Sequence, residues 1–276
     1  MAVVARARDR RGRHDHRRAG VMPSDHLDDR PATPEARAQE RAELYRRLPL
    51  LEGDRWWVEL ARASSDGRVL ELGAGTGRLT AAFVEAGLQV TAVERDEAML
   101  RGLHERVGGT VTVVARDVTQ LPPLEPFGLV VLATSLLNEL PDPLARRRTL
   151  AAAAAACRPD GKVAIHLLGP WWLVRIPLRS TGRLHTADGS GPVDVSVAED
   201  GFDAWSGRRR ATLTYHFGDG TRLRDHLDAA VVTPGELELA LDGAGLEVVA
   251  SHGAAPPGDA PTVDASAWHV VCRPRR

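Results

Sequence analysis

A cluster of glycines directly after a short apolar segment is the first feature of the sequence that could carry chemistry. Gly73, Gly75 and Gly77 follow segment 68–72 (RVLEL), whose acidic residue is Glu71. Glycine allows the backbone to turn sharply and lets a ligand approach the main chain closely. The spacing is Gly-x-Gly-x-Gly, whereas a dinucleotide fold prefers Gly-x-Gly-x-x-Gly. By itself such a turn is weak evidence for a cofactor, so its companion residues decide the interpretation.

Two carboxylates stand at the ends of the next two apolar segments. Glu94 ends segment 89–93 (QVTAV), where it could accept hydrogen bonds from both ribose hydroxyls. Asp117 follows 111–115 (VTVVA), where it could accept one from an adenine amino group. Taken singly, either could be a helix N-cap or a solvated loop residue. The carboxyl ends of parallel strands form the ligand-binding edge of an open sheet, so the three features in this order predict an adenosine site.

The elements that must hold these residues alternate between strand and helix patterns. The expected strands are 68–72, 89–93, 111–115, 129–134 and 162–168. One helix is expected from the glycines to about residue 86, and two more near 97–106 and 143–157. Such alternation predicts parallel strands with crossover helices on both faces. The expected fold class is α/β, a doubly wound Rossmann-like sheet, with residues 67–170 and 233–276 as its cofactor-binding domain.

The pattern changes after Pro170. Residues 171–232 contain strand-like runs at 193–197 and 210–217, and Asp-Gly turn signals begin at positions 188, 200 and 219. We expect an antiparallel β insertion after the fifth strand, which covers the site of the substrate that accepts a transferred group.

The C-terminal part returns to the sheet. Thr233, Pro234 and Glu236 form a capping-box pattern at the start of a helix over 234–244. Strands near 246–250 and 267–272 are then expected to complete the sheet as an antiparallel hairpin.

The chain begins with an Arg-rich segment, residues 1–32, that has few apolar side chains. This composition predicts a disordered tail, with a nucleic-acid arm as the alternative, and Met22 could serve as the translation start. Residues 33–66 are expected to form a helical cap, with a first helix over 34–51 and a second around Trp56 and Trp57.

The composition argues against several other classes of function. The net charge is −1 at pH 7, so no overall field attracts nucleic acid or anionic lipid. No segment approaches the roughly 20 apolar residues that span a bilayer. Cys157 and Cys272 fit no metal or redox spacing, and the histidines form no metal-ligand motif. We expect a cytoplasmic, metal-free protein with no membrane or nucleic-acid partner.

Segments VLELGAGTGRLT (69–80), VTAVERDEAML (90–100) and VVARDV (113–118) resemble the successive motifs of class I S-adenosylmethionine-dependent methyltransferases, over about Arg41 to Leu168. The resemblance implies S-adenosyl-L-methionine as cofactor and S-adenosyl-L-homocysteine as product. It assigns Glu71 and the three glycines to the methionine portion, Glu94 to the ribose and Asp117 to the adenine amine. The remaining residues that it implies for the cofactor are Arg95 and Met99 flanking the adenine, Val118 packing on the ring, Thr76 and Thr134.

A looser resemblance joins ATSLLNEL (133–140), the GPWW run (169–172) and the β-rich insertion to bacterial small-molecule methyltransferases. These include amino-sugar N-, glycine-type N- and pyrroloindole C-methyltransferases. In them an upstream tyrosine often closes over the cofactor, which implies Tyr45 here; helix-face packing is the alternative. Such relatives often carry His or Tyr where this sequence has Glu139. Glu139 could act as a base or as a partner of a cationic acceptor, or it could be an ordinary residue at a helix start.

Other polar and aromatic residues are candidates for catalysis or substrate binding, and each also has a purely structural interpretation. His166 lies on the fifth strand, where it could act in catalysis or be a hydrogen-bonded core histidine. Trp171 and Trp172 could stack on an acceptor or simply anchor the insertion. The insertion residues that could line a substrate wall are Tyr215, His216 and Arg224.

Together these features predict methyl transfer to a small-molecule acceptor, with N- or C-methylation favoured over O-methylation, in natural-product tailoring. One alternative is a non-catalytic S-adenosylmethionine-binding regulatory or scaffold protein. A nucleic-acid methyltransferase is disfavoured because Thr134-Ser135-Leu136-Leu137 stands where an Asp/Asn-Pro-Pro-Tyr-type tetrapeptide would be expected. A homodimer is compatible with the sequence.

Overall fold

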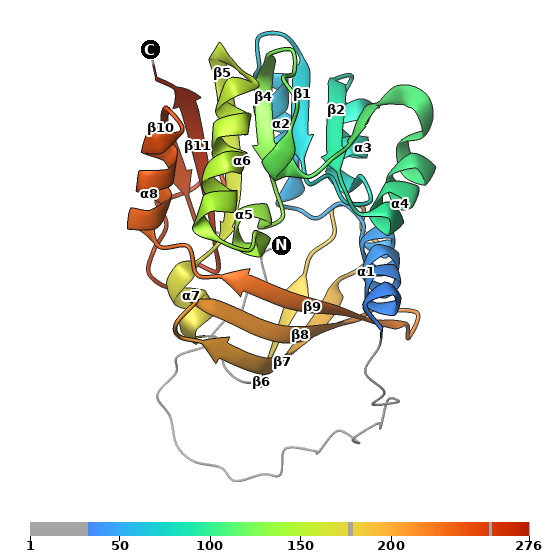
Figure 1. The fold of residues 1–276 in the computed structure, drawn as a ribbon. Coiled ribbons are helices and arrows are strands. Elements are labelled where there is room, and N and C mark those ends of the chain that lie inside the picture. Colours follow the sequence, from blue (N-terminus) through green and yellow to red (C-terminus); the bar gives the residue numbers. More distant parts are fainter. Residues whose placement is uncertain (1–32, 176–178, 254–255, 276) are drawn as a thin grey trace.

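The computed structural model of the protein describes residues 33–175, 179–253 and 256–275, and contains two sheets (Figure 1). The larger sheet has seven strands in the order β10-β11-β5-β4-β1-β2-β3. The smaller sheet has four strands in the order β6-β7-β8-β9. The predicted tail, residues 1–32, lies outside the described residues.

The larger sheet confirms the predicted fold class. Its strands are β1 (Arg68–Leu72), β2 (Gln89–Glu94), β3 (Thr112–Ala115), β4 (Phe127–Leu132), β5 (Cys157–Leu168), β10 (Leu246–His252) and β11 (Ala267–Pro274). Strands β1 to β5 pair in parallel, whereas β11 runs antiparallel to both β5 and β10. The chain moves outward from β1 to β3 and then returns to β4 on the other side of β1. The strand order therefore switches between β1 and β4, where open sheets of this type bind ligands.

Helices cover both faces of this sheet (Figure 1). In chain order the helices of the described residues are α1 (Pro34–Arg47), α2 (Asp54–Arg62), α3 (Arg78–Glu85), α4 (Glu97–Val107), α5 (Leu136–Glu139), α6 (Pro143–Ala155), α7 (Pro170–Arg175) and α8 (Pro234–Gly243), with short 3₁₀ turns η1 (Gly108–Thr110) and η2 (Val118–Gln120). Helix α1 packs against β9 and α4, and α7 lies beside the smaller sheet, so these two do not cover the faces of the larger sheet. The side chain of Thr233 caps α8 as predicted, and the side chain of Thr33 caps α1 in the same way. Helix α1 ends at Arg47 and not at Leu51, because Pro49 favours the extended conformation of Leu48 (ψ 119°).

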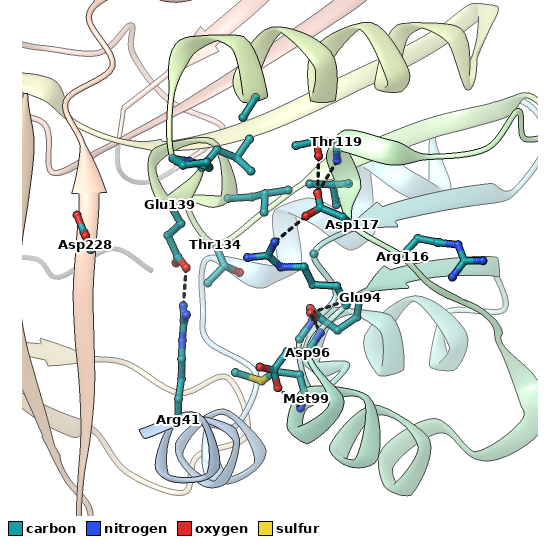
Figure 2. A pocket seen from close by; sticks show the side chains of 18 of the residues that line it. Arg41, Glu94, Asp96, Met99, Arg116, Asp117, Thr119, Thr134, Glu139 and Asp228 are labelled. Atoms are coloured by element: carbon teal, nitrogen blue, oxygen red, sulfur yellow. Dashed lines mark hydrogen bonds and ion pairs between the residues drawn. The ribbon is translucent and has the colours of Figure 1, made fainter. Parts of the chain in front are cut away.

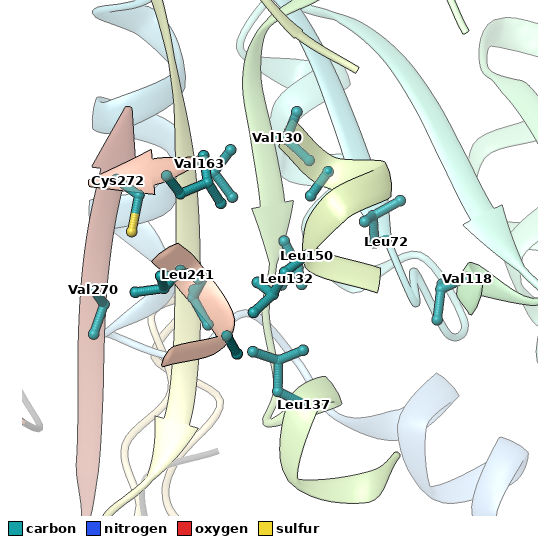
Figure 3. Close-up of a cluster of buried hydrophobic side chains, with 14 of the residues drawn as sticks. Leu72, Val118, Val130, Leu132, Leu137, Leu150, Val163, Leu241, Val270 and Cys272 are labelled. Atoms are coloured by element: carbon teal, nitrogen blue, oxygen red, sulfur yellow. The ribbon is translucent and has the colours of Figure 1, made fainter. Parts of the chain in front are cut away.

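Two apolar clusters fix the layers. One joins α5, α6 and α8 to the sheet, and includes Leu72, Leu132 and Val163 (Figure 3). The other, which includes Trp56, Trp57 and Phe83, joins α2 and α3 to the opposite face. Strand β4 is buried along its whole length, as expected for a central parallel strand covered on both faces.

The smaller sheet is the predicted antiparallel insertion. Its strands are β6 (Arg179–Leu184), β7 (Val193–Asp203), β8 (Arg208–His216) and β9 (Arg222–Ala230). The sequence pattern does not predict β6 or β9, whose residues are mostly polar. The expected turn at Asp200-Gly201 is wrong, because Gly201 follows a register shift inside β7. Leu44 of α1 and Leu48, the residue after the helix, pack on this sheet. Within the described residues, no helix has the length and apolarity needed to cross a bilayer.

Candidate active site

A cavity of about 860 Å³ lies at the carboxyl ends of the parallel strands, between α1, the turn after β4 and strand β9 (Figure 2). Most of the residues predicted for the site line it. These are Tyr45, Gly73, Gly75, Glu94, Arg95, Met99, Asp117, Val118, Thr134 and Glu139. The features that the sequence places at separate strand ends therefore meet in one cavity.

The glycine bend connects β1 to α3 in a conformation that suits glycine. Gly73, Gly75 and Gly77 have φ angles of 73°, 58° and 77°, in the left-handed region. Gly73 and Gly75 line the cavity, whereas Gly77 faces α4: a Cβ there would lie 2.5 Å from Cδ1 of Leu103. Gly77 therefore allows close helix packing, and the other two glycines expose backbone to a ligand.

Glu94, at the end of β2, is held against this bend by backbone donors. The Gly75 N–H donates to Oε2 (2.9 Å), and the N–H groups of Arg95 and Asp96 donate to Oε1 (2.7 and 2.9 Å). Each carboxylate oxygen has two lone pairs, so Oε2 can accept a further hydrogen bond. The orientation of Glu94 is therefore fixed, as a ribose partner would require.

Asp117 is the N-cap of the η2 turn and faces the same cavity. Thr119 donates to Oδ1 from its N–H (2.8 Å) and its hydroxyl (2.7 Å), while Arg95 Nη1 lies 2.6 Å from Oδ2. Burial opposes the charged form, but the bonds from Thr119 and the Arg95 ion pair outweigh it and lower the pKa of Asp117. An ionised carboxylate is a suitable acceptor for an amino group.

Glu71 and Thr76 lie behind the cavity surface, with exposed fractions of 3% and 2%. Glu71 Oε2 accepts a hydrogen bond from the Thr80 hydroxyl (2.6 Å). Burial raises the pKa of Glu71 to about 7, more strongly than the Thr80 bond lowers it, and the nearby Glu94 adds to the rise. A nearby cation would stabilise the charged form of such a buried carboxylate. Glu71 and Thr76 are not among the cavity residues, so their predicted direct contact with the cofactor is not found in this geometry.

Glu139 lines the cavity from α5, but it is ion-paired. Arg41 Nη2, on α1, donates to Glu139 Oε2 at 2.6 Å (Figure 2). Arg41 Nε also lies 3.3 Å from Asp225 Oδ1 on β9, and the Tyr45 hydroxyl donates to Asp225 Oδ2 (3.5 Å). The sequence gives no signal for Arg41 or Asp225, because three distant segments contribute to this cluster.

His166 does not line the cavity, so its predicted catalytic role is not supported by its position. It is 3% exposed, and its Nδ1 accepts a hydrogen bond from the Ser135 N–H (2.9 Å). Burial lowers the pKa of His166 well below the usual value, and the neighbouring charges of His269 and Arg78 act in the same direction. The ring is therefore neutral, and it supports the turn at Thr134 and Ser135, whose φ angles are 54° and 62°.

The aromatic candidates for the substrate wall lie elsewhere. Tyr215 is fully buried in the core between the small sheet and α1. Trp172 packs against Leu173, and Trp171 is 40% exposed on the outside of α7. Their predicted contact with an acceptor is not found among the cavity residues.

The polar candidates of the insertion are also outside the cavity. His216 contacts the Ser196 hydroxyl (3.0 Å), and Arg224 contacts Glu40 of α1 through its N–H and its Nε (2.9 and 3.3 Å). The insertion residues that do line the cavity are Arg208, His226 and Asp228. The sequence pattern misses His226 and Asp228 because β9 itself was not predictable, and it misses Arg208 because the predicted run 210–217 begins two residues after the start of β8.

The comparisons with known proteins agree with this geometry. Residues 69–161 match the family described as Methyltransferase domain. The CcbJ methyltransferase from Streptomyces caelestis has a TM-score of 0.71 at 22% identity, over 87% of this chain and 98% of that one. CalS10, an amino pentose methyltransferase from Micromonospora echinaspora, has a TM-score of 0.62 at 19% identity, over 85% and 95%. At these identities the two structures establish the fold alone.

A curated relative matches a short stretch of the chain. The Ribosomal RNA small subunit methyltransferase A of Anaeromyxobacter sp. (strain K) is 44% identical over 64 residues, which cover 23% of this chain and 22% of that relative. The chain thus matches about a fifth of the relative's length. Residues 69–161 are thus similar to the family described as Methyltransferase domain, and the strand order and the glycine bend agree with that similarity.

Proposed function

We propose that this chain transfers a methyl group from S-adenosyl-L-methionine to a small-molecule acceptor in the cytoplasm. N- or C-methylation is favoured over O-methylation, in natural-product tailoring, and the protein could act as a homodimer. One observation carries the proposal: the glycine bend, Glu94 and Asp117 line the same cavity as Glu139 and residues of the insertion. A single cavity can therefore hold the methyl donor and its acceptor together.

The residues present fit the cofactor in their chemistry. When bound, S-adenosylmethionine supplies an electrophilic methyl group on a sulfonium. Glu94 would hold the ribose, Asp117 the adenine amino group, and the backbone at Gly73 and Gly75 the methionine portion. Since the leaving group is already good, the protein's main task is to align donor and acceptor and exclude water.

The insertion supports a small acceptor. Strand β9, which carries Asp228, lies across the cavity from Glu94, and the residues after α5 also line it (Figure 2), so the acceptor would be covered on several sides. CalS10, which resembles this chain in fold, is described as an amino pentose methyltransferase, and this favours an amine or sugar acceptor here as well.

Two alternatives remain distinct from this proposal. A non-catalytic cofactor-binding protein would retain Glu94 and the glycine bend but would transfer no methyl group. Ribosomal RNA is the substrate named for one relative, but the shared stretch is only 64 residues long and covers 22% of that relative.

Methyl-labelled S-adenosylmethionine separates these functions. The purified chain is incubated with the labelled cofactor and either a small-metabolite extract or ribosomal RNA. We expect label in small molecules and none in RNA; transfer to RNA would contradict the proposal. Cofactor binding without transfer to either pool would favour the non-catalytic alternative. The Glu139→Gln variant should reduce turnover while the affinity for the neutral product S-adenosylhomocysteine changes less than about threefold, since Glu139 faces the acceptor side.

A further inference from the structure

The ion pair between Arg41 and Glu139 connects a residue outside the segment matched by the family with a residue inside it. Arg41 lies on α1, before the matched segment 69–161, and Glu139 lies within it, on α5. The two side chains meet at the cavity, where Arg41 Nη2 is 2.6 Å from Glu139 Oε2 (Figure 2). The carboxylate that faces the acceptor side is thus held by a residue from outside the domain that carries it.

Arg41 is itself held from two further directions. Its Nε forms an ion pair with Asp225 Oδ1 at 3.3 Å, without hydrogen-bond geometry, and its guanidinium carbon lies 5.4 Å from the centre of the Tyr45 ring. Asp225 is on the inward face of β9, with a side chain only 7% exposed. Burial opposes the charge of Arg41, but Glu139 and Asp225 outweigh it and raise the pKa of Arg41 well above its usual value. The guanidinium therefore stays charged and bridges two carboxylates from different segments.

This arrangement leaves one Glu139 oxygen available. Oε2 accepts from Arg41, whereas Oε1 has no hydrogen-bond partner within the part of the chain that the structure describes. The Glu139 side chain is 28% exposed, at the cavity wall. The cluster holds one cation and two carboxylates, so it keeps a net negative charge towards a ligand. Arg41 thereby restricts the rotamers of Glu139 without cancelling the charge of the cluster.

We propose that Arg41 is a positioning residue, which bridges Glu139 to Asp225 and so directs the free oxygen of Glu139 toward the methyl-transfer position. The inference rests on the proposed function, because it assumes that the cofactor's sulfonium lies in this cavity. Tyr45 lies one helical turn after Arg41, and its ring is 3.9 Å from a Cβ built on Gly75. Helix α1 therefore places Tyr45 beside the glycine bend and Arg41 beside Glu139.

Two cofactor analogues test this without an acceptor. S-adenosylhomocysteine is neutral at sulfur, whereas sinefungin carries an amine where the transferable methyl group would be. A carboxylate aimed at this position binds sinefungin preferentially, and Glu139→Gln should reduce that preference about tenfold. Calorimetry of both analogues gives the preference as a ratio of dissociation constants.

Arg41 could act only through its positive charge, or it could position Glu139. The direction in which Arg41→Gln changes the preference for sinefungin over S-adenosylhomocysteine decides between these two roles. If Arg41 only adds positive charge, removing it strengthens sinefungin binding relative to S-adenosylhomocysteine. If it positions Glu139, the same change lowers the preference about tenfold, and the double variant matches Glu139→Gln alone, since both changes disable one interaction. A raised or unchanged preference in Arg41→Gln would overturn the inference. So would a double variant whose preference falls by the product of the two single-variant factors.

Two further variants complete the experiment. Arg37→Gln removes an exposed arginine one turn earlier on α1 and should leave the preference unchanged. Arg41→Lys keeps the charge but cannot bridge two carboxylates with a planar fork, so it should lower the preference at least threefold and also serves if Arg41→Gln does not fold. A wild-type preference in Arg41→Lys would overturn the inference. Failure of the wild-type chain to bind S-adenosylhomocysteine would instead overturn the proposed function.

Discussion

At the scale of single residues, burial decides the chemistry of Glu71. Its side chain is 3% exposed, and its pKa is raised to about 7 from an ordinary value of 4.5. The sequence predicts its place just ahead of the glycine bend, because strand and glycine patterns are local. Its degree of burial depends on α3 and the neighbouring strands, so the sequence could not predict the pKa.

This shift predicts a pH-dependent stability. Because the folded-state pKa is the higher one, protonation of Glu71 favours the folded state below pH 4.5, and this contribution is lost as pH rises through about 7. Relative to Glu71→Gln, the free energy of unfolding of the wild-type chain should fall by about 3 kcal/mol between about pH 4 and about pH 8. Denaturant titrations of both proteins check this, and a constant difference would contradict the assignment.

Gly77 gives a second prediction at this scale. Alanine there combines a left-handed φ of 77° with a Cβ 2.5 Å from the Leu103 side chain, and should lower the free energy of unfolding by about 2–4 kcal/mol. Gly87 has a similar φ of 81° but nothing within 4 Å, so Gly87→Ala should cost only about 1–2 kcal/mol. Equal losses in the two variants would mean that the packing of α3 on α4 is not the cause.

At the scale of elements, the alternating pattern predicts most of the parallel strands and crossover helices within a few residues. It extends the fourth strand to Thr134, but β4 ends at Leu132 because the next turn contains the left-handed residues Thr134 and Ser135. It does not predict β9, because a strand of alternating charged residues such as RLRDHLDAA carries no clear apolar period. Residues 222–230 form a strand because they pair with β8 in the smaller sheet.

Asn138 of α5 connects the end of β9 to the end of β5. Its Nδ2 donates to the Ala230 carbonyl at the end of β9 (2.8 Å), and its Oδ1 accepts from the Leu168 N–H at the end of β5 (2.9 Å). Asn138→Ala would leave two buried backbone groups unpaired, so the free energy of unfolding should fall by about 2–5 kcal/mol. Denaturant titration measures this, with Glu238→Ala on the exposed face of α8 as the control. A loss below about 1 kcal/mol would show that water or repacking satisfies both groups.

At the scale of the whole molecule, the cavity combines residues that sequence patterns cannot bring together. The carboxylates at strand ends were predictable, since parallel strands place their carboxyl ends at one edge. Arg41 and Glu139 are 98 residues apart, and Tyr45 and Asp225 are 180 apart, and no local pattern links either pair. The packing of α1 on the small sheet determines both contacts. This explains why the cofactor half of the site was largely predictable and the acceptor half was not.

The central claim is that the glycine bend, Glu94 and Asp117 bind one adenosyl group. Calorimetric titration with S-adenosylhomocysteine tests it most directly. We expect micromolar binding by the wild-type chain, weakened at least tenfold by Glu94→Ala and by Asp117→Ala, because each removes a charged hydrogen-bond acceptor. The matched control Glu85→Ala, on the exposed end of α3, should bind like wild type. Affinities unchanged in both site variants, with heat of binding still present, would contradict the account.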